Sequence, residues 1–455
     1  MQAKHPEPAQ TLHRWLLSVV NACCRFWRRA GLAACFGAGI VLLAGSFFLA
    51  SAQAQNGNGA APVIARAIHL VEGDTTETLA IIVDLSEETA LRHEVITGPD
   101  RLVIDLERTI VAAGAQRVSG KLLPPIGALR AGLFMAGHSR IVVDLARPVL
   151  VERTDFVRQG GVARLVVQLR VTSAEAFLAQ ARLDSARRAA NRAARPAPPA
   201  EGKADPRPLI VIDPGHGGID PGASGPKGEA EKDIVLAVGR NLRARLERSG
   251  KIRVVMTRED DRFISLNERM SFARSREAAL FVSLHADSLA GEPDVRGASV
   301  YTLSDRASDA AAARAAEKEN RADLIAGLDA DEEAKGGIET ILVDLARRET
   351  RAFAQIAARQ TVSALGNARL HKTPMRAAGF RVLRAPDMPS ILIELGYLSN
   401  PADLAGLMDD QTRGGLVSAL AEALEAFVLT TRAPETAGTG QPGVAPGQES
   451  SGSRP

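Results

Sequence analysis

The sequence predicts an α/β domain with a largely parallel sheet flanked by helices, preceded by a small all-β domain. Two observations support this prediction. Between residues 209 and 430, short apolar strand patterns alternate with segments of helical periodicity, which is typical of a parallel sheet with crossover helices. Between residues 62 and 172, short β-rich runs follow one another with turn residues between them, which is typical of a small β-sandwich.

The all-β region, 62–172, repeats one strand pattern. The four copies are IIVDL (81–85), LVIDL (102–106), IVVDL (141–145) and LVVQL (165–169), and Gly98, Pro99 and Asp100 supply a turn between the first two. Aspartates recur at equivalent positions of this pattern. We interpret them as edge or turn residues. A catalytic role is disfavoured, because no histidine or second carboxylate accompanies them at a constant spacing.

The α/β region alternates strands and helices along its length. The expected strands are 209–213, 252–257, 280–285, 297–303, 380–384 and 390–395. The expected helices are 231–248, 265–277, 305–326, 338–365 and 412–428. Between the two domains, residues 173–208 are expected to form a helical and proline-rich linker. Residues 432–455 are rich in Gly, Pro, Ser and Thr without periodicity, so we expect a disordered tail.

Residues 1–54 have the features of a secretory signal peptide. A basic stretch ending in Arg28 and Arg29 precedes an apolar run and the small-residue stretch ASAQAQ, so we expect cleavage after Ala52 or Ala54. A retained membrane anchor is the alternative, because the apolar run is long enough to span a bilayer. The arginine pair could also mark a twin-arginine signal, although the residues after it match that pattern poorly. After cleavage we expect no stable membrane span.

Removal of this segment changes what the composition implies. The segment holds five of the 56 basic residues and one of the 53 acidic ones, so 51 basic and 52 acidic residues remain, with a net charge of −1. Such a balance gives no reason to expect a nucleic-acid partner. The chain's cysteines, Cys23, Cys24 and Cys35, all lie in the removed segment. An exported protein without cysteine has no disulfide framework and depends on its hydrophobic cores.

Four polar side chains lie where an α/β sheet gathers its ligands, at the carboxyl ends of strands. His216 follows the strand LIVID, His285 closes LFVSLH, and Glu394 interrupts ILIELGYL. Glu231 begins the helix EKDIVLAV at the sheet-facing end of its apolar stripe. A buried carboxylate at that position is costly unless it is paired or bound to a metal.

Each of these residues also has an ordinary structural interpretation. His216 alone could be a hydrogen-bonded loop residue, Glu231 a helix-dipole residue, and Glu394 a charge on an edge strand. Taken together they predict two imidazoles and a carboxylate that converge from strand ends. That donor set suits Zn²⁺, which takes nitrogen and oxygen ligands and keeps a fourth position open for water.

Four ordered motifs carry a family resemblance that covers residues 209–430. DPGHGGIDPGA, EKDIVLAV, SLHAD and PSILIELGYLSN resemble the signature of zinc-dependent N-acetylmuramoyl-L-alanine amidases. The resemblance implies that His216, Glu231 and His285 are the zinc ligands and that Glu394 is the catalytic carboxylate. It also implies cleavage of the amide between N-acetylmuramic acid and the L-alanine of the stem peptide.

Upstream, GPDRLVIDL and RIVVDLARP resemble the AMIN domain of cell-wall amidases. This implies a targeting module, over residues 62–172, that binds peptidoglycan or the envelope near the septum. The resulting expectation is a periplasmic peptidoglycan hydrolase at the division septum that remodels the cell wall and separates daughter cells.

Two other functions are compatible with an exported zinc-site protein. A zinc carboxypeptidase acting on stem peptides is one, but no H-x-x-E pair surrounds His216 or His285, and H-E-x-x-H is absent. The other is a non-catalytic envelope-binding scaffold, which would have no need to keep all four residues, Glu231 and Glu394 included.

Residues 304–337 form an insertion that is longer than an α/β connection needs. We expect a helix to about residue 326, followed by an acidic loop, and a solvated surface helix is the simplest interpretation. The family resemblance implies another: division-linked amidases carry an insertion here that covers the active site until an activator with a LytM-type domain displaces it. Glu317 and Glu319 are the candidates to reach the open zinc position, and the resemblance favours Glu319.

Overall fold

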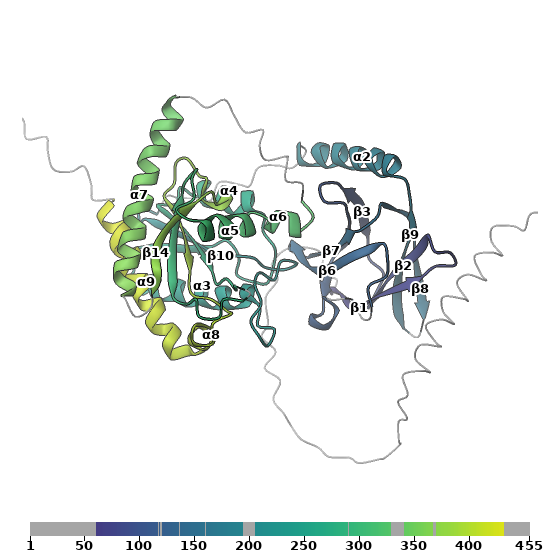
Figure 1. Cartoon of the computed structure of the whole chain (residues 1–455), viewed down its shortest axis with the longest axis horizontal. Helices are drawn as coiled ribbons and strands as arrows, with labels where there is room; N and C mark the ends of the chain where they lie inside the picture. The colour runs from purple at the N-terminus through teal and green to yellow at the C-terminus, as the bar shows by residue number, and fades with distance from the viewer. Residues whose placement is uncertain are drawn as a thin grey trace, which may run out of the picture.

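The computed structural model describes residues 61–193 and 205–431, except residues 117, 119, 120, 136, 160, 290, 329–340 and 367–369. The expected signal peptide (1–54) and tail (432–455) lie outside the described residues. So do residues 194–204 of the expected linker and residues 329–337 of the insertion. An all-β domain that ends in helix α2 (Ala174–Ala193) precedes an α/β domain (Figure 1).

The N-terminal domain is a sandwich of two sheets. Their strand orders are β5-β1-β2-β9-β8 and β3-β4-β7-β6, and neighbours pair antiparallel except β1 with β5. The strands are β1 (Val63–Glu72), β2 (Thr78–Leu85), β3 (Leu91–Ile96), β4 (Arg101–Glu107), β5 (Thr109–Val111), β6 (Ile126–Met135), β7 (His138–Leu145), β8 (Val149–Gln159) and β9 (Val162–Val171). Apolar residues from both sheets form one buried core, as expected for an all-β sandwich.

The repeated strand pattern corresponds to the central strands of the two sheets, β2 and β9 in one and β4 and β7 in the other. Its aspartates each face an arginine directly across the neighbouring strand, at ion-pair distances of 2.9, 2.6 and 3.2 Å. The pairs are Asp84 with Arg164, Asp105 with Arg140, and Asp144 with Arg101. The interpretation as edge or turn residues is therefore wrong, because these are cross-strand pairs on the outer faces of central strands.

The C-terminal domain contains a six-stranded sheet of order β11-β10-β12-β15-β13-β14, parallel at every pair except that of β13 with β15. Its strands are β10 (Leu209–Pro214), β11 (Arg253–Met256), β12 (Leu280–His285), β13 (Ala298–Leu303), β14 (Leu370–Ala378) and β15 (Ser390–Glu394). Its helices are α3 (Glu231–Glu247), α4 (Leu266–Arg274), α5 (Ala310–Glu319), α6 (Ala322–Ile325), α7 (Ile341–Leu365), α8 (Pro401–Met408) and α9 (Asp410–Thr431). The predicted α/β class with a largely parallel sheet is confirmed.

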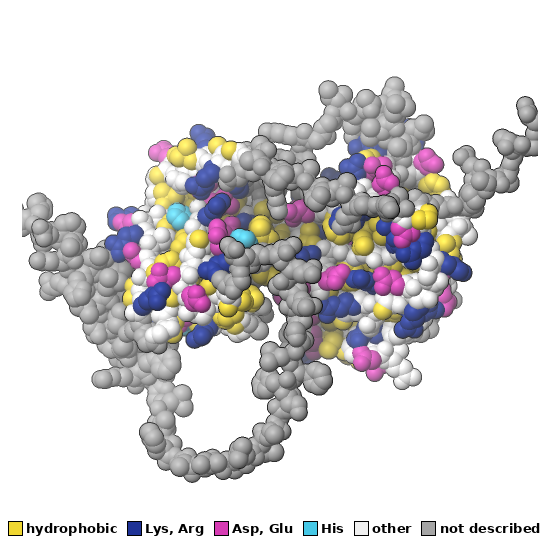
Figure 2. All heavy atoms as spheres, turned by 180° about the vertical axis from the view of Figure 1, so that it is seen from behind, with side chains coloured by type: hydrophobic (Ala, Val, Ile, Leu, Met, Phe, Trp, Pro, Cys, Tyr) yellow, Lys and Arg dark blue, Asp and Glu magenta, His cyan; other side chains and the backbone are white. Residues whose placement is uncertain are grey.

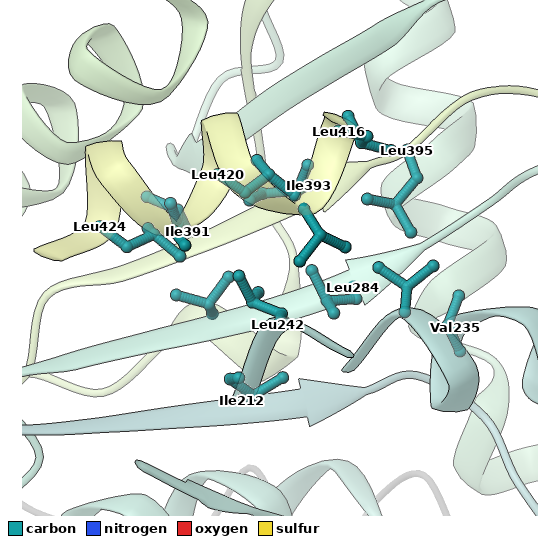
Figure 3. Close-up of a cluster of buried hydrophobic side chains, with 14 of the residues drawn as sticks. Ile212, Val235, Leu242, Leu284, Ile391, Ile393, Leu395, Leu416, Leu420 and Leu424 are labelled. Carbon is teal, nitrogen blue, oxygen red and sulfur yellow. The ribbon is translucent and has the colours of Figure 1, made fainter. Parts of the chain in front are cut away.

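Helices cover both faces of this sheet (Figure 1). On one face, Leu242 of α3 and Leu420 and Leu424 of α9 pack against Ile391 and Ile393 of β15 (Figure 3). Helices α4, α5 and α6 cover the other face. Helix α9 is long and apolar enough to cross a membrane by length and composition, but its Leu416, Leu420 and Leu424 are buried in the core of this domain. In the view of Figure 2, basic and acidic side chains are interspersed over both domains.

The edge strand of the sheet next to β13 is not the one that the sequence predicted. The expected strand 380–384 is instead a single 3-10 turn, η4 (Arg381–Leu383), and the edge strand is β14. Phe380 gives this segment its apolar pattern, but its side chain packs beneath α4 and α5 and is not part of a strand. Strand β14 has a weak strand pattern because an edge position tolerates both Pro374 and the exposed Lys372.

The insertion is also less continuous than expected. Instead of one helix to about residue 326, α5 begins after Asp309, whose side chain caps it, and ends at Glu319, with Asn320 as its C-cap. The short helix α6 follows. Helix α8, which was not expected, begins with an Asn400 cap and Pro401 in its first turn.

Candidate metal centre

Side chains from three separate segments meet at the carboxyl end of the sheet, where β10, β12 and β15 are neighbours. His216, Glu231 and His285 each offer one ligand atom, and these atoms lie within 4.8 Å of one another in a buried position. Glu231 Oε1 is 3.2 Å from His216 Nε2 and 3.2 Å from His285 Nδ1. The structure thus brings two nitrogens and one carboxylate oxygen to one point.

The turn that carries His216 has an uncommon backbone conformation. The φ of His216 is +59°, in the left-handed region, and Gly217 and Gly218 also have positive φ. A Cβ at residue 215 would lie only 2.5 Å from His285 Nε2, so the second imidazole packs against the bare backbone of Gly215. Glycine at this position therefore lets the two imidazoles approach, with ring centroids 4.8 Å apart.

Asp220 orients the ring of His216. Its Oδ2 lies 2.8 Å from His216 Nδ1, and both side chains are buried. A neutral His216 that donates from Nδ1 to this carboxylate presents Nε2 as an acceptor toward Glu231. Nε2 is itself buried without a hydrogen-bond partner. An orphaned buried nitrogen that faces a carboxylate and a second imidazole fits a metal ligand.

Two buried arginines hold the backbone beneath His216. Arg258 donates to the carbonyl oxygens of Pro214 (2.9 Å) and Gly215 (2.8 Å). Arg269 donates to the carbonyl oxygens of Pro214 (2.9 Å) and His216 (2.7 Å), and to Asp213 Oδ1 (2.7 Å). Burial lowers the pKa of Arg258 to about 10, which leaves it charged at neutral pH. The strained turn is therefore held by charge-assisted hydrogen bonds.

The site carries an excess of negative charge. Burial opposes protonation of His216, but the carboxylates of Asp220, Glu231 and Glu319 outweigh burial and raise the pKa of His216 well above its usual value. Burial also opposes ionisation of Glu231, yet His216 and His285 hold its pKa well below the usual range. Surroundings that favour a positive charge on an imidazole also favour a divalent cation in the same place.

Glu394 lies opposite His285 in the pairing of β15 with β12. Its Oε2 accepts a hydrogen bond from the backbone N–H of Asp287 (3.0 Å), while its Oε1 is buried without a partner. Burial, with repulsion from Asp287 and Glu231, raises the pKa of Glu394 well above its usual value. One carboxylate oxygen beside the donor cluster is thus anchored and the other is free.

Comparison with known proteins assigns the family. Residues 210–426 match the profile of the family described as N-acetylmuramoyl-L-alanine amidase, and residues 70–169 match the AMIN domain. N-acetylmuramoyl-L-alanine amidase AmiC of Neisseria meningitidis serogroup B is 34% identical over 355 residues, which cover 75% of this chain and 84% of the relative. The chain belongs to the N-acetylmuramoyl-L-alanine amidase family.

Further amidases are similar. AmiC of Escherichia coli is 31% identical over 338 residues, which cover 70% of this chain and 79% of the relative. Among solved structures, the amidase AmiC2 of Nostoc punctiforme is 27% identical over 49% of this chain and 97% of that chain, with a TM-score of 0.35.

Sequence reasoning did not single out three residues that shape the amidase site, Asp220, Arg258 and Arg269. Asp220 lies in the motif DPGHGGIDPGA, and Arg258 and Arg269 lie in the stretch TREDDRFISLNERMSFA (257–273). The sequence signal that could have identified these residues is the presence of a charged residue between neighbours that are expected to be buried. The second stretch also forms a capping box at the start of α4, because Ser265 and Glu268 exchange side-chain to backbone hydrogen bonds.

Helix α5 of the amidase domain lies over the donor cluster. Glu319 Oε2 is 3.1 Å from His285 Nδ1 and 3.3 Å from His216 Nε2, and the side chain is buried. Glu317, the other glutamate considered, is exposed and pairs with Arg321. Of the two glutamates, the structure therefore brings only Glu319 to the candidate metal centre.

The buried arginines generate a stability prediction. Replacement of Arg269 by leucine leaves the Asp213 carboxylate without its ion-pair partner and two buried carbonyl oxygens without this donor. We expect Arg269→Leu to lower the free energy of unfolding by about 3–5 kcal/mol, measured by urea denaturation. Arg274→Leu is the control, because the Arg274 pair with Asp387 is about half exposed and should be worth less than about 1 kcal/mol. Equal losses in the two variants would contradict the assigned role of Arg269.

Proposed function

We propose that this chain is a periplasmic zinc-dependent N-acetylmuramoyl-L-alanine amidase. Its substrate is peptidoglycan, and the bond cleaved joins N-acetylmuramic acid to the L-alanine of the stem peptide. The observation that carries the proposal is the buried cluster of His216, Glu231 and His285 beside the unpaired Oε1 of Glu394, in a chain of the amidase family. In the cell, this activity serves cell-wall remodelling and the separation of daughter cells at the division septum.

The donor set supports zinc over harder cations. His216 Nε2, His285 Nδ1 and a Glu231 oxygen are two nitrogens and one oxygen, whereas Mg²⁺ and Ca²⁺ are held by oxygen ligands. Glu231 is held in place by hydrogen bonds from the backbone N–H groups of Ala223 (2.7 Å) and Ala286 (2.8 Å). When bound there, zinc supplies Lewis-acid chemistry, since it lowers the pKa of water and polarises a carbonyl oxygen.

Glu394 is the proposed proton carrier of the reaction. The Asp287 N–H fixes its Oε2, so Oε1 is the atom that accepts a proton from the attacking water. The same Oε1 then returns the proton to the departing nitrogen of L-alanine. A general base works best when its pKa lies near the operating pH. Burial raises the pKa of Glu394, and a dication held by the neighbouring His285 and Glu231 would bring that pKa back down.

Helix α5 is proposed to be an inhibitory lid, with Glu319 in the position that water and substrate need. Its last turn is fastened from both sides of Glu319. Lys318 pairs with Asp287. Asn320 accepts from the N–H of Arg381 (2.7 Å) and donates to the carbonyl of Gly379 (3.0 Å). The family resemblance suggests that an activator with a LytM-type domain displaces this lid at the septum, where the AMIN domain directs the enzyme.

The first test concerns the metal. We expect His216→Ala and His285→Ala to lower the zinc content from about one ion per chain to a small fraction, because each side chain supplies one of three protein ligands. Elemental analysis of purified protein after dialysis against a weak chelator measures this. His69→Ala, in the AMIN domain, is the control and should keep its zinc. Full zinc occupancy in either ligand variant would exclude the proposed ligand set.

The second test separates catalysis from metal binding. Glu394→Gln is nearly isosteric but cannot accept a proton, so it should retain zinc and lose activity by about 10²-fold or more. The measurement is mass spectrometry of digested peptidoglycan, in the wild-type chain and in a Glu319→Ala background. The proposed reaction releases stem peptides with a free L-alanine amine. Trimmed stem peptides would point to a carboxypeptidase instead, and undiminished cleavage by Glu394→Gln would exclude Glu394 as the base.

The third test concerns the lid. We expect Glu319→Ala to raise the basal activity, because it empties the position next to His216 and His285 without removing a proposed ligand. Release of dye from labelled peptidoglycan without any activator measures the effect. Glu317→Ala is a matched control on the exposed side of the same helix and should leave the basal rate unchanged. A folded, zinc-loaded Glu319→Ala protein no faster than wild type would reject the inhibitory lid.

A further inference from the structure

The two domains share a buried apolar contact. Its members from the AMIN domain are Ile96, Val103 and Val142, and its members from the amidase domain are Ile219, Phe263 and Ala326. The AMIN side uses the outer face of the four-stranded sheet, since Val103 and Val142 alternate along β4 and β7 with residues that face the sandwich core. In Figure 1, α6 lies next to β6 and β7.

The first contact holds the chain segment that follows the lid. Gly327 has a φ of +71°, and a Cβ there would lie 2.7 Å from Val103 Cγ2 and 3.2 Å from Val142 Cγ2, so the turn fits directly onto the AMIN sheet. Arg140 Nη1 donates to the carbonyl oxygen of Ala326 (3.0 Å), the C-cap residue of α6. The AMIN domain thus both packs against this turn and supplies a buried hydrogen bond to it.

Arg140 is preorganised for this contact. The carboxylate of Asp105 binds it through two hydrogen bonds of 2.6 and 2.8 Å, and its guanidinium carbon lies 3.5 Å from the centroid of the Phe134 ring. Phe134 in turn stacks on Phe263 of the amidase domain, with ring centroids 5.9 Å apart. Because Asp105 and Phe134 already hold the guanidinium, Arg140 loses little conformational entropy when it also binds the carbonyl of Ala326.

The second contact reaches the turn of His216. A Cβ at Gly132 of β6 would lie 2.7 Å from the backbone nitrogen of Ile219, which follows His216 by three residues. The carbonyl oxygen of Leu133 accepts a hydrogen bond from the N–H of Phe263 (3.3 Å). Strand β6 therefore touches the loop that carries a proposed metal ligand.

A continuous set of contacts links the AMIN sheet to Glu319. Helix α6 starts three residues after Glu319, and the backbone N–H of Leu266 donates to Asp323 in α6 (3.0 Å). Ala326 and Gly327 follow and lie against Val103. The inhibitory helix is thus fastened at its C-terminal side by the AMIN domain.

We propose that the AMIN domain is part of the inhibitory apparatus, because its strands β4 and β7 dock on the Gly327 turn and stabilise the closed position of α5. This inference rests on the proposed lid and names the surface that holds it. Any event that separates the two domains then favours lid opening, and lid opening weakens the contact between the domains, because coupling between two equilibria is reciprocal.

The experiment compares two substitutions on the outer faces of the two AMIN sheets. Val103→Lys places a charge in the contact with Gly327. Val166→Lys is the matched control, because Val166 is buried on the outer face of the other sheet, with Ala80 and Ile82, away from the amidase domain. Both positions point away from the sandwich core, so both proteins should fold. Thermal unfolding of the full chain checks this.

The primary measurement is hydrogen exchange of the α5 and α6 amides in the full zinc-loaded chain. We expect Val103→Lys to speed their exchange by about 5- to 30-fold and to raise basal activity in the same range, while Val166→Lys changes neither. Val142→Lys, on the neighbouring strand, should reproduce the effect. Unchanged α5 and α6 exchange in both folded interface variants would overturn the inference.

The outcomes separate this inference from the lid itself. If Glu319→Ala activates the enzyme but Val103→Lys leaves α5 exchange unaltered, the lid stands and the role of the AMIN domain is refuted. If Glu319→Ala fails to activate, the lid is refuted, and faster exchange in Val103→Lys reports only a structural contact. In the supporting case, Val103→Lys adds little activity to Glu319→Ala, because the lid is already ineffective.

Discussion

The buried ion pair between Asp213 and Arg269 is the constraint on which the site depends. Asp213 is the penultimate residue of the parallel strand β10, and its carboxylate also accepts hydrogen bonds from Thr257 (2.6 Å) and Ser283 (2.8 Å) of neighbouring segments. Burial opposes its ionisation, but the attraction of Arg269 outweighs burial and lowers the pKa of Asp213. Because the same guanidinium also binds the carbonyl of His216, the end of the sheet and the unusual turn after it form one rigid unit.

Much of this organisation could be predicted because it follows from strand ends. His216, His285 and Glu394 end or follow apolar runs, and parallel strands bring such positions to one edge. Asp220 could not be found in this way, because its contact with His216 Nδ1 depends on the left-handed turn between them. The cross-strand partners of Asp84 and Asp144 depend on strand register, which the repeated pattern does not encode.

The choice between Glu317 and Glu319 illustrates a second limit. Ala312, Ala316 and Glu319 form the buried side of α5. The helix is so rich in alanine that its sequence marks no apolar stripe, and neither glutamate is distinguished by helical phase. The prediction of a strand at 380–384 was wrong for a related reason. A short apolar run that is buried under two helices has the same sequence pattern as a buried strand.

In the proposed lid, the carboxylate of Glu319 is covalently part of the molecule whose site it would block, and this has a kinetic consequence. A tethered group competes at an effective concentration of millimolar or more, set by the chain that joins it to the site and not by the amount of protein present. Dilution of the protein does not weaken such competition. A higher concentration of peptidoglycan displaces the tethered carboxylate only poorly. Activation then requires a molecule that binds the open state of the helix more tightly than the closed state. Shifting a two-state population from about 1:99 to 99:1 requires about a 10⁴-fold preference for the open form.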